Sequence, residues 1–307
     1  MRPNDRTGLA IFLSLVALSL FDAMGLVIKL LSERYSAMEL SAWRNFFGLF
    51  PALIAVFASR AWHAAGRPLR IRQWKLAFAR GAIVTVAQLC FYISLGVLAF
   101  ATASTITYAN ALFMTALAVP LLGEHVGWMR WGAVLIGFVG VLLIMQPGTD
   151  AFTPYALLPL GAAFFYALVG VTARLFDEDV PSPLISLYAQ VTAILVSTLV
   201  ALSWDGFTPI QSWGDLGWIM AMGAFGGTAV LFLVASYRMT EQSNLAPFSY
   251  FGIPLAFLLG WLFFDETPWD ALFPGAFLIA AGGLLIIWRE RRLKAGTRGL
   301  VNNARER

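Results

Sequence analysis

Charged side chains are scarce in this chain. Asp, Glu, Lys and Arg make up 12% of its 307 residues, about half the share that soluble domains carry. Hydrophobic residues make up 59%, and the mean hydropathy is +0.75. A single soluble core would not need so much apolar surface, so the composition indicates a protein that lies in a lipid bilayer.

Cysteine and histidine are almost absent. The single cysteine, Cys90, excludes an internal disulfide and a cysteine-based metal cage. The two histidines, His63 and His125, fall in expected loops, and no Ser–His, Asp–Asp or histidine-cluster pattern is present. An intramembrane enzyme needs such groups at membrane depth. We therefore expect no enzyme, no cofactor and no metal.

Apolar runs long enough to cross the hydrocarbon core as helices, about 20 residues each, recur along the chain. They fall at residues 8–31, 38–58, 76–97, 99–121, 127–145, 153–175, 182–204, 214–237, 244–264 and 268–288. The loops are short and leave no room for a soluble domain. The expected fold class is all-α integral membrane, with ten transmembrane helices.

Lys and Arg are unevenly distributed between the loops. With the N-terminus inside, most of them lie on the inner side, chiefly in loop 59–75 and in the basic tail 289–307. The net charge of +4 is thus a topology signal and does not indicate nucleic-acid binding. We expect a bacterial inner (plasma) membrane protein with both termini cytoplasmic, whose tail also contacts anionic lipid.

The second half of the chain is a degenerate copy of the first. Residues 79–146 align on 221–288 without a gap, at an offset of 142, and upstream the offset is 145. The less common coincidences are Tyr108/Tyr250, Glu124/Glu266, Gly81/Gly223, Gly140/Gly282, Gly25/Gly170 and Lys29/Arg174. Because each copy has five spans, repeat 153–288 must be inverted relative to repeat 8–145. Such repeats in a membrane chain are typical of transporters with a central substrate pathway.

Three charged side chains within spans are functional candidates, because a charge in mid-membrane costs about 2.5 kcal/mol or more. Asp22 is a candidate proton or cation site, or a partner for a substrate amine; alternatively Arg44 neutralises it and its role is structural. Arg44 is a candidate partner for a substrate carboxylate or for Asp22, or its side chain snorkels to the interface. We expect Lys29, two turns after Asp22, to snorkel in the same way.

Polar and aromatic side chains occur within several spans. Gln88, Phe91 and Tyr92 share one side of a helix by their spacing. With them we group Tyr108, Asn110, Tyr166 and Tyr250. Together these residues predict a substrate pocket with aromatic walls and neutral hydrogen-bonding groups. Taken singly, each tyrosine is also compatible with ordinary packing.

Three further residues are candidates for structural or gating roles. Glu124 and Glu266 follow spans at helix junctions, where a carboxylate can accept hydrogen bonds from the free amides that begin the next helix. Pro254 is either a bend used in alternating access or a static kink.

These motifs resemble the EamA family of the drug/metabolite transporter superfamily. The first half reads Tyr108 to Pro120, Leu122-Gly123-Glu124, then Gly132 to Gly140; the second reads Tyr250 to Pro254, Asp265-Glu266, then Gly275 to Gly283. The resemblance covers Gly8 to Trp288. It implies ten helices around a central cavity that opens alternately to either side, and it is closest to the family's aromatic and neutral amino-acid exporters.

The expected function is therefore export of small zwitterionic metabolites, such as aromatic or other large neutral amino acids. The partners are that small molecule and the lipid bilayer, and a monomer is compatible with the sequence. Proton-coupled efflux of organic cations through Asp22 is the alternative. A membrane assembly or receptor module without transport is the third hypothesis, and the inverted repeat argues against it.

Overall fold

A computed structural model describes residues 7–64, 66, 69–123, 127–148, 152–177, 180, 182–239, 245–266, 273–285 and 288. The helices are α1 (Thr7–Leu31), α2 (Ala37–Phe57), α3 (Arg60–Ala64), α4 (Trp74–Val97), α5 (Phe100–Thr107), α6 (Asn110–Leu122), α7 (Trp128–Met145), η1 (Pro154–Ala156), α8 (Leu157–Thr172), η2 (Ala173–Leu175), α9 (Ser182–Trp204), α10 (Trp213–Met239), η3 (Ala246–Phe251) and α12 (Gly252–Phe264). A further helix spans Gly275–Leu285. The described part of the chain contains no strand.

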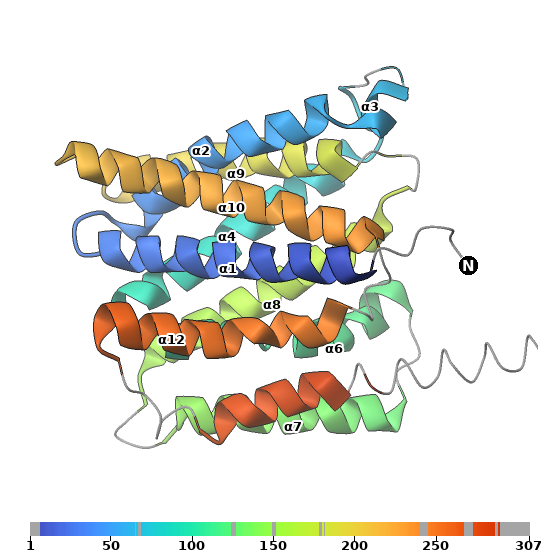
Figure 1. Cartoon of the computed structure of the whole chain (residues 1–307), viewed down its shortest axis with the longest axis vertical. Coiled ribbons are helices and arrows are strands. Elements are labelled where there is room, and N and C mark those ends of the chain that lie inside the picture. The colour runs from blue at the N-terminus through green and yellow to red at the C-terminus, as the bar shows by residue number, and fades with distance from the viewer. Residues whose placement is uncertain are drawn as a thin grey trace, which may run out of the picture.

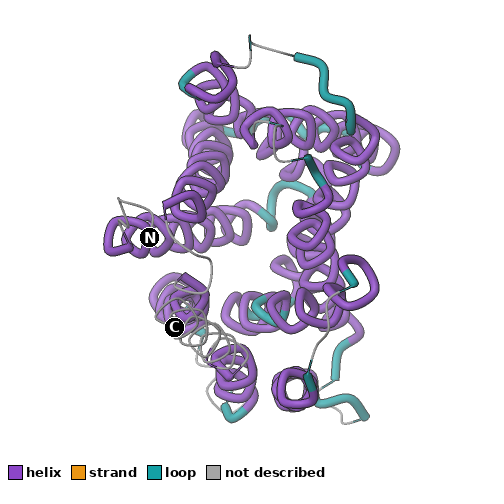
Figure 2. The backbone as a smooth tube through the Cα atoms, turned by 90° about the vertical axis from the view of Figure 1, so that its right-hand side faces the viewer, coloured by secondary structure: helices purple, strands orange, loops and turns teal. Residues whose placement is uncertain are grey.

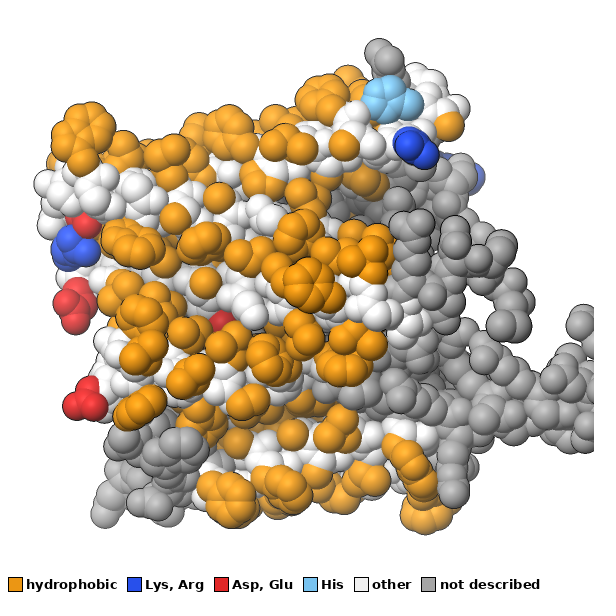
Figure 3. All heavy atoms as spheres, in the orientation of Figure 1, with side chains coloured by type: hydrophobic (Ala, Val, Ile, Leu, Met, Phe, Trp, Pro, Cys, Tyr) orange, Lys and Arg blue, Asp and Glu red, His pale blue; other side chains and the backbone are white. Residues whose placement is uncertain are grey.

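The long helices lie side by side, as expected for a membrane protein (Figures 1 and 2). Among the described residues, seven helical segments are long and apolar enough to cross a membrane, and Trp131–Met145, Gly252–Phe264 and Gly275–Leu285 are shorter apolar helices. On the face drawn in Figure 3, hydrophobic side chains cover the middle, and most charged side chains lie toward the helix ends. The chain is an all-helical integral membrane protein.

Helices of the first half pack mainly on helices of the second half. The main contacts are α1 with α10, α2 with α10, α2 with α9, α4 with α8, α4 with α9, α6 with α8, and α5 with α12. Exchanging each helix for its repeat mate maps the five contacts among α1, α2, α4, α8, α9 and α10 onto one another. The contact of α1 with α10 becomes α8 with α4, for example, and that of α2 with α9 becomes itself. These five contacts are as expected for two halves related by a two-fold exchange, whereas the contact of α6 with α8 corresponds to a much smaller contact of α1 with α12.

Close helix contacts at glycine also recur at repeat-equivalent positions of the two halves. Gly81 of α4 faces Thr192 of α9, and Gly223 of α10 faces Phe47 of α2. Gly81 and Gly223 are repeat mates, and so are Thr192 and Phe47. In both places the glycine leaves no room for a Cβ, so the two backbones can approach each other.

The last helices of the two halves also meet at glycine. A Cβ on Gly140 would lie 2.6 Å from the carbonyl oxygen of Gly275, and a Cβ on Gly282 would lie 2.6 Å from that of Ala133. Gly275 is the repeat mate of Ala133. These two contacts join α7 to helix Gly275–Leu285, which lie together in Figure 1.

One expected span is interrupted. The sequence predicts a single helix over 99–121, but α5 ends at Thr107 and α6 begins at Asn110. In the second half, the change from η3 to α12 falls between Phe251 and Gly252, the repeat mates of Ala109 and Asn110. Interrupted spans free backbone groups at membrane depth, which is typical of transporter binding sites.

The substitution Gly140→Ala is expected to destabilise the protein, because the added methyl group overlaps the Gly275 carbonyl. Overpacking of this kind costs about 1–3 kcal/mol, and the apparent Tm of the detergent-solubilised protein should fall. Gly132→Ala in the same helix is the matched control, because a Cβ there meets nothing within 4 Å. Equal melting temperatures for the two variants would contradict the contact.

Candidate functional site

A hydrogen-bonded network centred on Asn45 joins α2, α4 and α9. The Asn45 side-chain amide donates to Gln88 Oε1 at 3.0 Å and lies 3.4 Å from Ser197 Oγ. Ser41 Oγ donates to the same Gln88 oxygen at 3.4 Å. Gln190 donates to the Asn45 carbonyl at 2.6 Å. In an apolar bilayer such bonds fix the relative positions of the three helices.

Asn45 and Gln190 occupy equivalent places in the two halves. They are 145 residues apart, which is the upstream repeat offset, and they bond to each other where α2 crosses its own repeat mate α9. The repeat relation exchanges these two residues, so the pair lies at the junction of the halves. We therefore assign this pair to architecture.

Arg44 is buried inside the bundle, with 5% of its surface exposed. Its Nη1 donates to Asn45 Oδ1 at 3.0 Å, and the guanidinium lies against Gly226 of α10, where a Cβ would meet Nε and Nη2 at 2.8 Å. Its Nε has no hydrogen-bond partner. The snorkelling alternative from the sequence is wrong, because the side chain turns toward the protein interior.

Asp22 lies in α1 with 6% of its surface exposed. The Tyr108 hydroxyl hydrogen-bonds to its carboxyl group, and the other carboxyl oxygen, Oδ2, has no partner. The same hydroxyl packs directly against Gly252, so only a glycine fits there. Tyr108 caps the end of α5 and Gly252 begins α12. Asp22 is thus connected to the interruption of one span and to the equivalent junction in the other half.

Asp22 and Arg44 do not neutralise each other. The described residues contain two ion pairs, Lys29–Glu266 and Arg34–Asp215, and neither involves Asp22 or Arg44. The alternative in which Arg44 pairs with Asp22 is therefore wrong for this conformation. Asp22 and Arg44 are thus two buried ionisable side chains, each with a hydrogen-bonding atom that has no partner.

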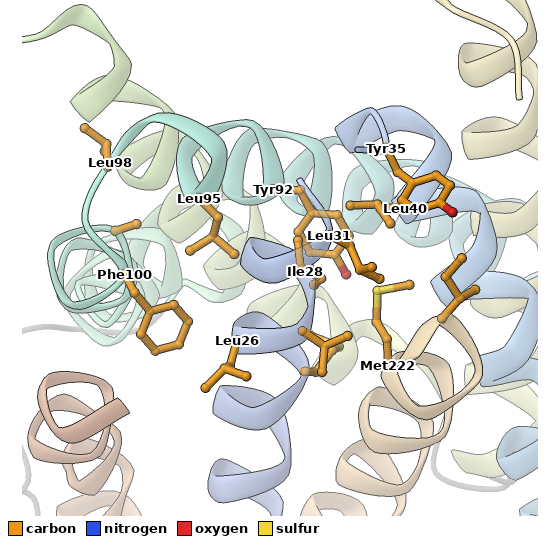
Figure 4. Packing of buried hydrophobic residues seen from close by; sticks show 14 of the residues in the cluster. Leu26, Ile28, Leu31, Tyr35, Leu40, Tyr92, Leu95, Leu98, Phe100 and Met222 are labelled. Atoms are coloured by element: carbon orange, nitrogen blue, oxygen red, sulfur yellow. The ribbon is translucent and has the colours of Figure 1, made fainter. Parts of the chain in front are cut away.

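Aromatic side chains lie beside Arg44. Tyr92 of α4 is buried next to the arginine and its hydroxyl has no partner, while Tyr166 of α8 lies within electrostatic reach of both. Phe91 packs beside Tyr92, with ring centroids 6.3 Å apart. Figure 4 shows Tyr92 extending toward Ile28 and Leu31 of α1. These rings supply the apolar side of the candidate site.

Asn110 and Tyr250 are not brought into this group. Asn110 is the half-buried first residue of α6. Tyr250 is buried in a second hydrophobic cluster, with Val141 and Ile279, and its hydroxyl packs against Gly283. Although it is the repeat mate of Tyr108, it contacts the last helix instead of a charged side chain.

Lys29 is held by protein contacts and does not snorkel. Its Nζ lies 2.7 Å from Glu266 Oε1, donates to the Leu98 carbonyl at 2.6 Å, and lies 5.1 Å from the centroid of the Phe264 ring. Glu266 Oε2 accepts a 2.7 Å hydrogen bond from the Phe100 amide, which begins α5 in the other half. The snorkelling expectation for Lys29 was wrong because a carboxylate from the distant end of the chain is within reach.

The remaining candidates for structural or gating roles are Glu124 and Pro254. Glu124 lies outside the described residues. Pro254 is the third residue of α12 and is exposed. In the first turn of a helix the missing proline amide has no intrahelical partner to lose.

Sequence reasoning missed Glu39 and Asn45. Glu39 is fully buried at the start of α2, and its Oε1 accepts from the Thr208 amide at 3.0 Å. The Ser36-x-x-Glu39 spacing of a capping box was the available signal. Ser36 does accept from the Glu39 amide, but the carboxylate bonds to Thr208 instead of the cap. For Asn45 the signal was its repeat relation to Gln190.

The repeat relation separates the remaining polar residues into two groups. Asp22, Arg44 and Gln88 align with Ala167, Ala189 and Val230. The two halves therefore share their architectural contacts but differ at these three positions. Polar groups that the repeat does not require are the best candidates for binding, and opposite charges beside aromatic rings can hold a zwitterion with an apolar or aromatic part.

Comparison with known proteins gives a family match and several relatives. The EamA-like transporter family matches residues 8–146 and 153–288. The S-adenosylmethionine uptake transporter of Rickettsia prowazekii is 26% identical over 91% of this chain and 92% of its own length. The pseudopaline exporter of Pseudomonas aeruginosa is 25% identical over 90% and 93%. The riboflavin transporter of Vibrio cholerae is 34% identical over 55% and 56%.

A solved crystal structure shares the fold. It superposes with a TM-score of 0.65 at 18% identity, covering 92% of this chain and 98% of the other.

The substitution Asn45→Ala is expected to destabilise the protein by about 1–2 kcal/mol, because it removes the 3.0 Å bond to Gln88 Oε1 and the oxygen that accepts from Arg44 Nη1. Melting in detergent should show a lower apparent Tm. Ser203→Ala is the control: that exposed hydroxyl bonds only to the Leu199 carbonyl of its own helix. A wild-type Tm for the Asn45 variant would show that the network does not hold the helices.

Proposed function

The chain belongs to the EamA-like transporter family, and we propose that it carries small zwitterionic metabolites with an aromatic or large apolar part across a bacterial inner membrane. The observation that carries this proposal is a buried carboxyl group, Asp22, and a buried guanidinium, Arg44, that form no ion pair with each other and each keep an unpartnered atom. The named relatives are transporters, not enzymes.

The chemistry of the ligand follows from the spare atoms. Arg44 Nε suits a carboxylate, and Asp22 Oδ2 suits an ammonium or another cationic group. The rings of Tyr92 and Tyr166 suit a flat or apolar remainder. Aromatic and large neutral amino acids have this pattern. So does S-adenosylmethionine, an amino acid that bears an aromatic base and is carried by the Rickettsia relatives.

Transport by alternating access is part of the same proposal. We take the ten apolar segments as ten transmembrane helices in two inverted five-helix halves, residues 8–145 and 153–288, around a central pathway, with both termini cytoplasmic. The exchange symmetry of the helix contacts and of the glycine contacts supports this arrangement. Tyr108 links Asp22 to Gly252, so a ligand that engages Asp22 acts on both interrupted spans.

Proton-coupled efflux of organic cations is the second candidate. It is favoured by one observation, the buried Asp22 carboxyl group with an unused oxygen. A cation without a carboxylate has no use for Arg44, so the two functions differ in their dependence on that residue.

The first test is exchange in proteoliposomes loaded with unlabelled S-adenosylmethionine or tryptophan, with labelled substrate followed in both directions. Arg44→Met should lower zwitterion exchange by about tenfold or more, since a hydrogen bond to a charged group contributes about 1.5–3 kcal/mol. Arg34→Met is the control, because Arg34 lies at the helix end in a half-exposed ion pair. Unchanged exchange in the Arg44 variant would contradict the proposed carboxylate partner.

Asp22→Asn separates the two candidate functions. We expect it to reduce exchange of the zwitterion, because the amide cannot pair with an ammonium group, while Tyr108 keeps an oxygen to bond. The comparison is pH-driven movement of a lipophilic cation in the same vesicles. Movement of the cation that needs Asp22 but not Arg44, with no zwitterion exchange, would establish organic-cation efflux instead.

A further inference from the structure

Two polar clusters lie at one end of the bundle, the end where α1 finishes and α2 begins. The first is Lys29 with Glu266. The second is Arg34 with Asp215, to which the Tyr35 hydroxyl also donates at 2.9 Å. Both ion pairs join the first half of the chain to the second. We call this end the Lys29 end.

The two ion pairs differ in what they connect. Arg34–Asp215 joins α1 to α10, and these helices also pack on each other extensively. Lys29–Glu266 joins α1 to the far end of α12, with which α1 has a much smaller contact. The pair also ties in the turn between α4 and α5, through the Leu98 carbonyl and the Phe100 amide. Losing the first pair leaves a packed interface in place, whereas losing the second removes much of what holds α12 to α1.

The two pairs also differ in environment. Arg34 is 42% exposed, so water screens its attraction to Asp215. The Lys29 and Glu266 side chains are only 15% and 14% exposed. Each has a second partner, so breaking the pair leaves both charges partly buried and incompletely bonded. Because a broken pair leaves both charges poorly satisfied, a partly open arrangement is unfavourable. Such a contact can therefore separate a closed conformation from an open one.

We propose that the Lys29–Glu266 ion pair is a gate contact that keeps the Lys29 end closed in this conformation and that breaks when the end opens. The inference rests on the proposed alternating-access function and adds the residues that control one of its two gates. The sequence carries the same charge types at the repeat-equivalent positions, Arg174 and Glu124.

Thiol labelling tests the gate without any substrate. In a Cys90→Ala background the chain has no cysteine, and Ala103→Cys places one thiol in the buried cluster, one turn into α5 from Phe100. A membrane-impermeant thiol reagent is added separately to right-side-out and to inside-out vesicles. Lys29→Met and Glu266→Gln should each raise the labelling rate about tenfold, equivalent to ~1.4 kcal/mol, from the face at the Lys29 end only.

The controls distinguish a gate contact from a contact that only stabilises the fold. Glu266→Gln keeps an oxygen for the Phe100 amide while removing the charge, so the fold should be retained. Arg34→Met, at the other ion pair of the same end, should leave the labelling rate unchanged. The double variant should match the single variants, because both remove one interaction. Unchanged labelling in folded Lys29 and Glu266 variants, or an equal increase in the Arg34 variant, overturns the proposal.

A second measurement fixes the contact in place. Lys29→Cys with Glu266→Cys, in the Cys90→Ala background, allows a short bifunctional thiol reagent to bridge the two positions. Bridging should stop exchange of tryptophan or S-adenosylmethionine, and a reductant that cleaves the bridge should restore it. Continued exchange through bridged protein overturns the gate. If neither compound moves even before bridging, the substrate proposal fails, and the labelling result still decides the gate.

Discussion

Lipid offers no hydrogen bonds, so every polar group at membrane depth must be satisfied by the protein or by what the protein binds. This constraint organises the described polar residues of the chain. Asn45, Gln88, Gln190 and Ser197 satisfy one another across three helices. Lys29 and Glu266 pair and also engage backbone groups. Asp22 and Arg44 differ from these groups, because each keeps an atom without a partner, as Glu39 and Arg80 also do, and they leave each other unpaired. Unused bonding capacity at these buried charges is costly unless a ligand takes it up.

The internal sequence repeat sorts these groups by role. A residue needed at both equivalent places serves the junction between the halves, as the glycine contacts and the Asn45–Gln190 bond do. A residue whose mate is alanine or valine cannot be serving that junction symmetrically. Asp22, Arg44 and Gln88 are of this second kind. The asymmetry is the expected mark of a ligand, because a small molecule with one ammonium and one carboxylate lacks the two-fold relation of its carrier.

Much of the architecture could be predicted from the sequence, because span length, charge asymmetry and repeats are direct consequences of the bilayer. The family was also evident from its glycine and glutamate spacing. The side-chain contacts could not be predicted in the same way. Lys29 was expected to snorkel, since nothing local shows that Glu266, far along the chain, ends beside it. Snorkelling was also an alternative for Arg44, but its side chain points into the protein, because Gly226 of a helix in the other half leaves space for the guanidinium. Such outcomes depend on which distant helices meet, and helix propensity carries no information on that.

In the proposed mechanism, the interruption between α5 and α6 connects binding to movement. A continuous helix would pass a disturbance along its length, whereas a break lets its two parts move separately. Tyr108 lies at this break, bonds to Asp22 and fills the space that Gly252 leaves at the equivalent junction in the other half. If a cationic group of the substrate displaces the tyrosine from Asp22, both junctions lose a shared contact at the same moment. The ends of those two broken spans contain Phe100 and Glu266, which belong to the contacts that close the Lys29 end. One hydrogen bond at the candidate site is thereby connected, through two helix segments, to the ion pair that we propose as a gate contact.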